Sequence, residues 1–538
     1  MKKVLALLLS FCMVFAVTAC GGDDGNAKSD GVVDVCVASE PQSIDPALNS
    51  AVDGAIMLQH AFEGLMKWVD DGEGNAIVAE GVAEKVEKSK DELTWTFHLR
   101  EDAKWSDGQP VTAQDFLYSW NRLIAKDTAA DYEYMLDMVE GYDKGKLNIK
   151  APDDHTFIVK LSTKCPYFEE ICAFPATFPV RKDIIEAEKD QWTFNPETYV
   201  SNGPYKMTAW EHNSYILFEK NENYYGAADL KAEKIKFHLM DDANAIYAGF
   251  QSGELDFIEN VPQDEVKGLI DSGDMILGDY IGTYYVCFQT EKKPFDDPRV
   301  RKAFSLVIDR NHMVEKITGS GEIPAAGYVP AGIYDAAGAG SDDFRTVGGD
   351  YYSIKAEDYE KNCEEARALL AEAGYPEGKD FPIVEYLYNT DDKHKAIAEA
   401  LQDVWQKELG VKVTLQNQEW NVFLQERKDG NYSIARNGWI ADYNDPMSFI
   451  DMWITDGGNN DAQYKNPAYD KIIKEAKATS DPEKRMSLMH QAEDILVGEE
   501  HVVAPIYFYT QPYMINKNIQ GMYYAPLGYF FFGYTTGA

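Results

Sequence analysis

One alternating segment, from Arg436 to Asp442, limits the fold and the ligand chemistry of this chain more than any other. Read as a β-strand, it places Arg436, Gly438, Ile440 and Asp442 on one face. The strand would run roughly 20 Å between the two charges, and a glycine inside a strand often marks the close approach of another backbone. An extended peptide covers ~3.3–3.6 Å per residue. A short zwitterionic peptide would therefore fit between the charges; the alternative is an ordinary strand with two solvated ends.

The amino terminus has the pattern of a secretion signal. Lys2 and Lys3 precede an apolar run at residues 4–17 that is too short to span a bilayer. Residues 17–20, Val-Thr-Ala-Cys, have the form of a lipobox, which predicts removal of residues 1–19 and lipid attachment to Cys20. The alternative is a plain secretory signal with an incidental cysteine.

Residues 20–31 show no apolar periodicity and predict a flexible linker behind that lipid. Lipid chains on Cys20 would anchor the protein to the outer surface of the cell membrane. No later apolar run is long enough to cross a bilayer, so we expect the rest of the chain to be soluble.

The composition excludes several classes of function. A formal net charge of −39 makes nucleic acids poor partners, because they reward basic surfaces. The cysteines after Cys20 are odd in number and lack the spacing of a metal site, so we expect buried free thiols. Hydrolase and nucleotide-binding motifs are absent, and the nine histidines form no ligand cluster. The chain is therefore predicted to be no enzyme and to need no metal or cofactor.

Local patterns predict a mixed α/β protein. Residues 93–99 and 156–161 alternate as strands do. Residues 362–373 form a predicted helix with Asn362 as its N-cap, and residues 393–409 form a second helix that stops at a glycine. The alternating residues 411–415 predict the strand that follows.

Segments along nearly the whole mature chain resemble the oligopeptide-binding proteins of peptide ABC importers, in extracellular solute-binding protein family 5. These segments, in the family's order, are residues 39–46, 62–65, 95–100, 105–113, 201–205, 295–301, 418–420, 427 and 436–446.

The resemblance implies an α/β, bilobal periplasmic-binding-protein-like fold of class II with an extra third domain. The first lobe would comprise residues 31–62, 182–281 and 513–538, and the extra domain residues 63–181. The remaining lobe would be 282–512. The ligand cleft would lie between the lobes, and the crossings near Ile281 and residues 509–512 would form a hinge.

The same resemblance assigns the ligand contacts. Asp442 would bind the α-ammonium group of a peptide, and Arg436, Arg427 and His394 would meet its carboxylate. Aromatic residues Trp420, Trp439 and Tyr132 would line side-chain pockets, while Val52, Gly438 and Ile440 would supply main-chain hydrogen bonds. The alternatives are a solvated turn aspartate at 442, a surface histidine at 394 and core tryptophans.

His394 lies near the predicted start of the 393–409 helix. A ligand carboxylate there would also gain from the exposed amides of the first helical turn.

Two departures from the family are visible. Many relatives carry a glutamate at the position of Ser50, so Arg427 and Arg436 should be less neutralised here, which leaves open the family's preferences for peptide length and basic residues. Some relatives also bridge cysteines at the positions of Gly282 and Ile440, and this chain lacks that bridge.

The expected function is capture of short peptides by a monomeric, membrane-anchored receptor that delivers them to the permease of an ABC importer. A receptor that senses a peptide pheromone would use the same residues. Binding of nickel, haem or a sugar by the same fold is a third reading, although those ligands need no partner for an ammonium group.

Overall fold

The structure is a computed structural model that describes residues 31–336, 338 and 342–538. The predicted signal peptide at 1–19, Cys20 and most of the linker at 20–31 lie outside these described residues. Within the described part, no helix is both long enough and apolar enough to cross a membrane.

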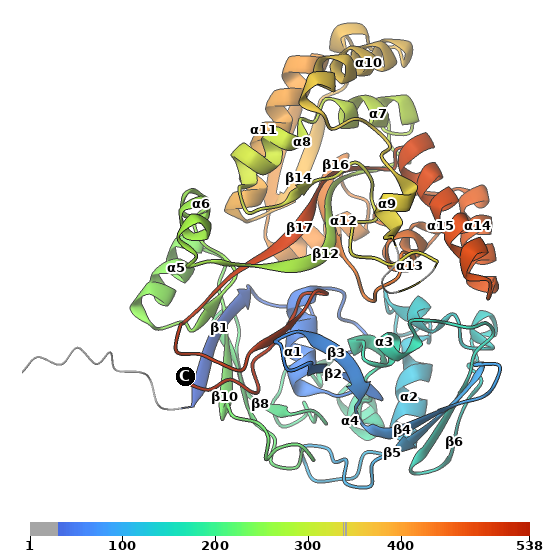
Figure 1. The fold of residues 1–538 in the computed structure, drawn as a ribbon, viewed down its shortest axis with the longest axis vertical. Coiled ribbons are helices and arrows are strands. Elements are labelled where there is room, and N and C mark those ends of the chain that lie inside the picture. Colours follow the sequence, from blue (N-terminus) through green and yellow to red (C-terminus); the bar gives the residue numbers. More distant parts are fainter. Residues whose placement is uncertain (1–30, 337, 339–341) are drawn as a thin grey trace, which may run out of the picture.

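One mixed sheet extends through the upper and lower parts of the molecule (Figure 1). Its strands are β1 (Val32–Ala38), β8 (Tyr205–Glu211), β9 (Tyr215–Lys220), β10 (Lys234–Leu239), β11 (Phe257–Ile258), β12 (Ile276–Phe288), β13 (Ile323–Pro324), β14 (Val384–Asn389), β15 (Val413–Gln418), β16 (Ile434–Ile440) and β17 (Val503–Ile515). Their order is β15-β14-β16-β12-β17-β11-β1-β10-β9-β8, with β13 attached to β17. Strand β1 is parallel to β10 and β11, and β14 is parallel to β15 and β16.

Strands β12 and β17 connect the two parts of this sheet, as Figure 1 shows. Each is 13 residues long, and they pair antiparallel with an interruption between Asp279 and Thr283. The predicted crossings near Ile281 and residues 509–512 both fall inside these strands. The division of the chain into lobes at those points remains a prediction.

Smaller sheets lie in the lower part. They contain β2 (Met66–Asp70) with β3 (Ala76–Glu80); β4 (Ala83–Lys88), β5 (Thr94–Leu99), β6 (Ile149–Asp153) and β7 (Thr156–Lys160); and β18 (Tyr523–Ala525) with β19 (Tyr529–Phe531). The predicted strands at 93–99 and 156–161 are β5 and β7, which pair with each other. The side chains of Trp95, Phe97 and Leu99 are buried, which explains the alternation along β5.

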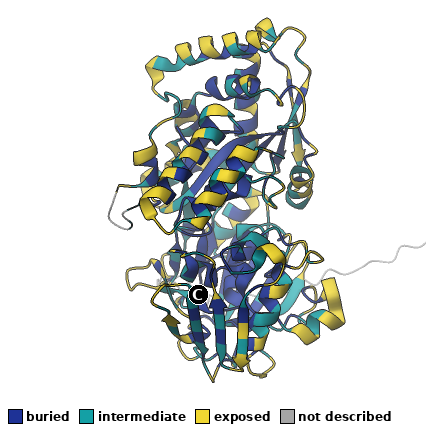
Figure 2. Cartoon of the chain, turned by 90° about the vertical axis from the view of Figure 1, so that its right-hand side faces the viewer, coloured by how far each residue is buried: buried dark blue, intermediate teal, exposed yellow. Residues whose placement is uncertain are grey.

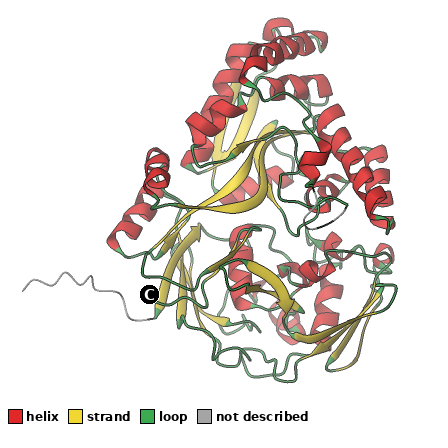
Figure 3. Cartoon of the chain, in the orientation of Figure 1, coloured by secondary structure: helices red, strands yellow, loops and turns green. Residues whose placement is uncertain are grey.

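Helices lie outside the strands in the upper part (Figure 3). The α-helices are α1 (Val52–Ala61), α2 (Ala113–Leu123), α3 (Phe168–Cys172), α4 (Lys182–Glu188), α5 (Ala243–Ser252), α6 (Gln263–Ser272), α7 (Pro298–Leu306), α8 (Arg310–His312), α9 (Phe344–Gly348), α10 (Tyr359–Glu372), α11 (Asp392–Leu409), α12 (Trp420–Lys428), α13 (Met447–Ile450), α14 (Pro467–Ala478) and α15 (Pro482–Glu493).

Helix α11 confirms the prediction for residues 393–409, and it ends at Gly410, which adopts a φ of 69°. The start predicted for α10 is wrong. Asn362 lies inside the helix, and its side chain donates to the Ser353 carbonyl instead of capping. A 3-10 turn at Ala356–Asp358 leads directly into α10 and makes a side-chain cap unnecessary. The strand predicted at 411–415 is shifted to β15.

Buried residues concentrate in the sheets and exposed ones on the outer helices (Figure 2). The cysteines of the described part, Cys36, Cys165, Cys172, Cys287 and Cys363, are buried free thiols, as predicted. Gly282 and Ile440 lie directly opposite each other in the β12–β16 ladder. A Cβ at Gly282 would be only 2.3 Å from Ile440 Cδ1, so the isoleucine side chain occupies the space beside Gly282.

Candidate functional site

Strand β16 has one unpaired edge. It pairs with β12 along its whole length, but β14 reaches only Ile434 and Ala435 on the other side. Between Arg436 and Ile440 that second edge carries no strand partner among the described residues. Ala441 N–H donates to the Ile281 carbonyl, so the odd-numbered residues bond to β12. The backbone groups of Arg436, Gly438 and Ile440 therefore point toward the free edge.

Arg436 is a buried cation at one end of this edge. Its Nε donates to Asn389 Oδ1 at 2.7 Å, and its guanidinium lies 5.2 Å from the ring centroid of Trp420 and 4.9 Å from that of Phe423. Only 6% of the residue is exposed, yet no carboxylate of the described residues lies within ion-pair distance. A buried guanidinium without a carboxylate is costly, which makes this residue a strong candidate for an anionic ligand group.

Arg427 is differently placed, because it has a carboxylate partner. Its Nε lies 2.7 Å from Asp461 Oδ2, and both side chains are largely buried. Asp461 also accepts from Asn437 Nδ2 at 3.0 Å. Asp461 thus gives Arg427 the carboxylate partner that Ser50 does not provide. Arg436 has no carboxylate within ion-pair distance among the described residues.

His394 lies in the first turn of α11, close to Arg436. Burial, together with the charge of Arg436, lowers the pKa of His394 to about 3, so the ring is neutral at physiological pH. At the helix start, Asp391 Oδ1 accepts from the His394 N–H at 2.8 Å. His394 can therefore contribute a hydrogen bond but no positive charge. Its own backbone amide, which was expected to help bind a ligand carboxylate, is bonded to Asp391 instead.

Asp442 lies two residues beyond the end of β16 and is buried, not solvated. Tyr132 Oη donates to its Oδ1 at 3.1 Å, and its own N–H donates to Ser448 Oγ at 2.8 Å. Burial raises the pKa of Asp442 well above its usual range; the Tyr132 hydroxyl opposes this, and the charge of Asp451 adds to it. The described residues place no cation within ion-pair distance of this carboxylate. The turn role falls instead to Asp445, which accepts from the Met447 N–H.

The side-chain-free space at Gly438 is occupied by the protein. A Cβ there would lie 2.3 Å from the hydroxyl of Tyr509, so a tyrosine of β17, not another backbone, makes the close approach. The Gly438 N–H donates to Asn437 Oδ1 at 2.8 Å. Ile440, farther along the edge, is half-buried.

Of the three aromatic candidates, two contact charged residues of the site and one holds the neighbouring backbone in position. Trp420 begins α12 and lies under Arg436, and Tyr132 reaches Asp442. Trp439 instead donates its indole N–H to the Ser448 carbonyl at 2.7 Å, which positions the segment that holds Asp442. Val52, the first residue of α1, approaches Gly528. Sequence reasoning missed the approach of Tyr509 to Gly438, which no local pattern marks.

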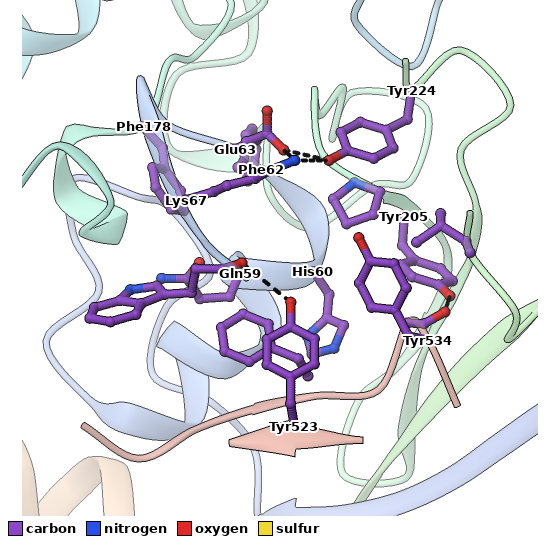
Figure 4. A pocket seen from close by; sticks show the side chains of 15 residues that line it. Gln59, His60, Phe62, Glu63, Lys67, Phe178, Tyr205, Tyr224, Tyr523 and Tyr534 are labelled. Atoms are coloured by element: carbon purple, nitrogen blue, oxygen red, sulfur yellow. Dashed lines mark hydrogen bonds and ion pairs between the residues drawn. The ribbon is translucent and has the colours of Figure 1, made fainter. Parts of the chain in front are cut away.

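A separate small cavity lies in the lower part, lined by Gln59, His60, Glu63, Lys67 and several tyrosines (Figure 4). Its polar groups are satisfied by protein: Glu63 accepts from Tyr224 and Tyr225 and pairs with Lys67. His60 Nδ1 lies 2.8 Å from the Ile56 carbonyl. In the part of the chain that the structure describes, no group of three or more acidic, histidine or cysteine side chains could hold a metal.

Comparisons with known proteins agree with this geometry. The family model "Bacterial extracellular solute-binding proteins, family 5 Middle" matches residues 78–461. The chain is 36% identical over 558 aligned positions to the oligopeptide-binding protein OppA of Bacillus subtilis, with 99% of each chain covered.

Two solved structures distinguish conformations. Haemophilus influenzae OppA in complex with RPPGFSPFR matches with a TM-score of 0.86 and 30% identity, covering 95% of this chain and 99% of that one. The unliganded open form of the murein tripeptide-binding protein MppA matches with a TM-score of 0.60 and 32% identity, covering 93% and 95%. The arrangement of the two parts of this chain is therefore closer to that of the peptide complex.

Proposed function

The chain belongs to the bacterial extracellular solute-binding proteins, family 5, and on that premise we propose that it captures short peptides between its two parts and delivers them to an ABC permease. The observation that carries this proposal is the free edge of β16, with Arg436 at one end and Asp442 beyond the other. Both charges are buried and lack a counter-ion among the described residues. An extended peptide with free termini supplies both counter-ions and the missing strand.

The proposal assigns a role to each end of the peptide. The α-ammonium group would pair with Asp442, which Tyr132 and Ser448 hold in position. The carboxylate would meet Arg436, with His394 as a neutral hydrogen-bond donor. The Gly438 carbonyl and the backbone groups of Ile440 would bind the peptide main chain, since the Gly438 N–H is bonded to Asn437. Because main-chain contacts ignore side-chain identity, many sequences would be accepted.

A thermodynamic cycle tests the pairing at Asp442. A free tetrapeptide and its N-acetylated form are titrated calorimetrically into the wild type and Asp442→Asn. Truncating one member of a buried charge pair costs ~2–5 kcal/mol. We therefore expect the variant to lose about tenfold or more in affinity for the free peptide, and little for the acetylated one. Equal losses for both peptides would contradict ammonium recognition by Asp442.

Import and pheromone sensing would use the same binding residues, so the free edge of β16 does not distinguish them. Uptake of a labelled tripeptide by cells with and without the gene separates the two. If cells that lack the gene no longer take up the tripeptide, import is supported. Normal uptake together with a lost transcriptional response to peptide would instead favour a signalling receptor.

Lipid attachment at Cys20 is proposed from the sequence pattern alone, and the residue lies outside the described part. The lipid would hold the receptor at the outer face of the membrane, near the permease. Cys20→Ser should yield unprocessed or released protein. Membrane-bound protein of the normal processed mass from this variant would show that Cys20 is not the anchor.

A further inference from the structure

Gly438 has a backbone N–H at the free edge of β16 that is already bonded within the protein. The Ala441 N–H donates to the Ile281 carbonyl, so the N–H groups of the even-numbered residues of β16 point away from β12. The Gly438 N–H nevertheless has a partner, because it donates to Asn437 Oδ1 at 2.8 Å. One donor of the free edge is therefore occupied by the side chain of the preceding residue.

Asn437 reaches this N–H from the face of β16 that Arg436 does not use. Side chains alternate along a strand, so those of Asn437 and Arg436 lie on opposite faces. The Arg436 face also contains the space at Gly438 that Tyr509 fills. The asparagine can therefore hold the donor without entering the face on which Arg436 lies.

The side chain of Asn437 is fixed at its other end by a charged group. Its Nδ2 donates to Asp461 Oδ2 at 3.0 Å, and the same oxygen lies 2.7 Å from Arg427 Nε. A hydrogen bond to a charged group is stronger than one between neutral groups, and only 1% of Asn437 is exposed. Turning the amide away from Gly438 would break both of its bonds inside the protein. We therefore expect the asparagine to keep this orientation when a ligand arrives.

This arrangement changes what the edge offers to an added strand. A peptide that pairs with a free edge directs both N–H and carbonyl groups at it. Opposite Gly438, the peptide N–H can donate to the Gly438 carbonyl. The peptide carbonyl oxygen instead meets a donor that Asn437 already occupies.

We propose that Asn437 is a specificity-determining residue of the binding edge, because it withdraws the Gly438 N–H and leaves one carbonyl of the bound peptide without a main-chain partner. This inference rests on the proposed function and adds a substrate class to it. The receptor tolerates ligands whose backbone departs from that of an ordinary peptide at this carbonyl, while it still requires the N–H groups. Arg427 and Asp461 act through Asn437 as positioning residues.

The test replaces single carbonyl oxygens of tetra-alanine by sulfur, because a thioamide is a weaker hydrogen-bond acceptor of similar shape. The parent and each thioamide peptide are titrated calorimetrically into the wild type and Asn437→Ala. The variant should bind the parent about threefold to tenfold more tightly, because the released N–H gains a partner. At one position the thioamide should abolish this gain, while the same change alters wild-type affinity by less than about twofold.

The control variant Asn431→Ala removes an exposed asparagine that precedes the same strand and should bind every peptide as the wild type does. Equal effects of the thioamides on the wild type and Asn437→Ala at every position would overturn the role of Asn437. If the wild type binds none of these peptides, the proposed function fails instead. Melting temperatures establish that both variants are folded.

A second measurement needs no variant. Hydrogen exchange of the Gly438 N–H is followed by nuclear magnetic resonance in the ligand-free wild type. Because Asn437 holds this N–H, it should exchange much more slowly than an unprotected amide. Exchange at the unprotected rate would show that the donor is free for a peptide, and the proposal would be wrong.

Discussion

At the scale of single residues, two arginines with equal standing in the sequence have opposite roles. Arg427 is joined to Asp461 at 2.7 Å and stabilises the fold around it. Arg436 is more buried and has only an amide oxygen and aromatic rings as partners. A guanidinium already paired with a carboxylate gains little from a second one. Arg436 is therefore the better candidate for the peptide carboxylate.

Methionine substitutions separate these roles. Arg427→Met leaves Asp461 buried without its cation, and removing one partner of a partly buried pair should cost about 1–3 kcal/mol of unfolding free energy. Arg436→Met removes a cation that has no counter-ion, so the melting temperature without ligand should be unchanged or higher, while peptide affinity falls about tenfold or more. Thermal unfolding and calorimetric titration measure both, with Arg436→Lys as the charge-preserving control. If the two methionine variants changed the melting temperature and the peptide affinity to the same extent, these separate roles of Arg427 and Arg436 would be contradicted.

At the scale of elements, β16 has a free edge that the proposed function uses as a template for an additional strand. Its odd-numbered backbone groups are used by β12, and its even-numbered ones face the free edge. A peptide added there would alternate in the same way, with every second amide directed at β16 and the others turned away.

The effect of peptide N-methylation on affinity should therefore alternate from one amide to the next. Methylating an amide that faces β16 removes a hydrogen bond and adds a clash, so affinity should fall by about tenfold or more. Methylating the next amide should have a much smaller effect. A series of tetrapeptides methylated at one position each, titrated against the wild type, reveals the pattern. A uniform loss along the series would show that the peptide does not bind as a strand.

At the scale of the whole molecule, contacts between residues 63–181 and the upper part hold the structure closed. Asn444 N–H donates to Glu170 Oε2 at 2.9 Å, and the rings of Tyr167 and Tyr443 stack at 4.1 Å. Lys477 forms ion pairs with Asp137 and Asp451. In this arrangement Arg436 and Asp442 are buried without a counter-ion among the described residues, which should oppose closure. A charged peptide offsets that cost, so ligand and closure should be coupled.

Lys477→Met should weaken peptide binding without touching the site, because it removes the ion pair with Asp137 that joins the two parts. It also leaves the buried Asp451 without its cation, so the melting temperature without ligand is measured alongside. A ligand's apparent affinity falls in proportion to the population of the competent state, so we expect faster dissociation and a smaller ligand-induced decrease of the radius of gyration. Stopped-flow dissociation and small-angle scattering measure these effects. The control Lys471→Met changes an exposed lysine of the same helix that pairs only with Glu475. Identical dissociation rates for wild type and Lys477→Met would contradict the coupling.

Local patterns in the sequence determined much of this protein. The alternation along residues 434–440 and the glycine after residue 409 encode β16 and the end of α11, because periodicity and left-handed turns are properties of neighbouring residues. The resemblance supplied the family, and it supplied the ligand contacts of Asp442 and Arg436 as predictions.

Only the tertiary structure decided which charges remain unpaired. Asp461 reaches Arg427, and Tyr509 fills the space at Gly438, both through sheet connections between segments distant in the chain. No local pattern encodes such encounters, because they depend on how β12 and β17 bring separate segments of the sheet together. The electrostatics of the site is therefore a property of the fold, whereas the strand that carries it is already determined by the sequence.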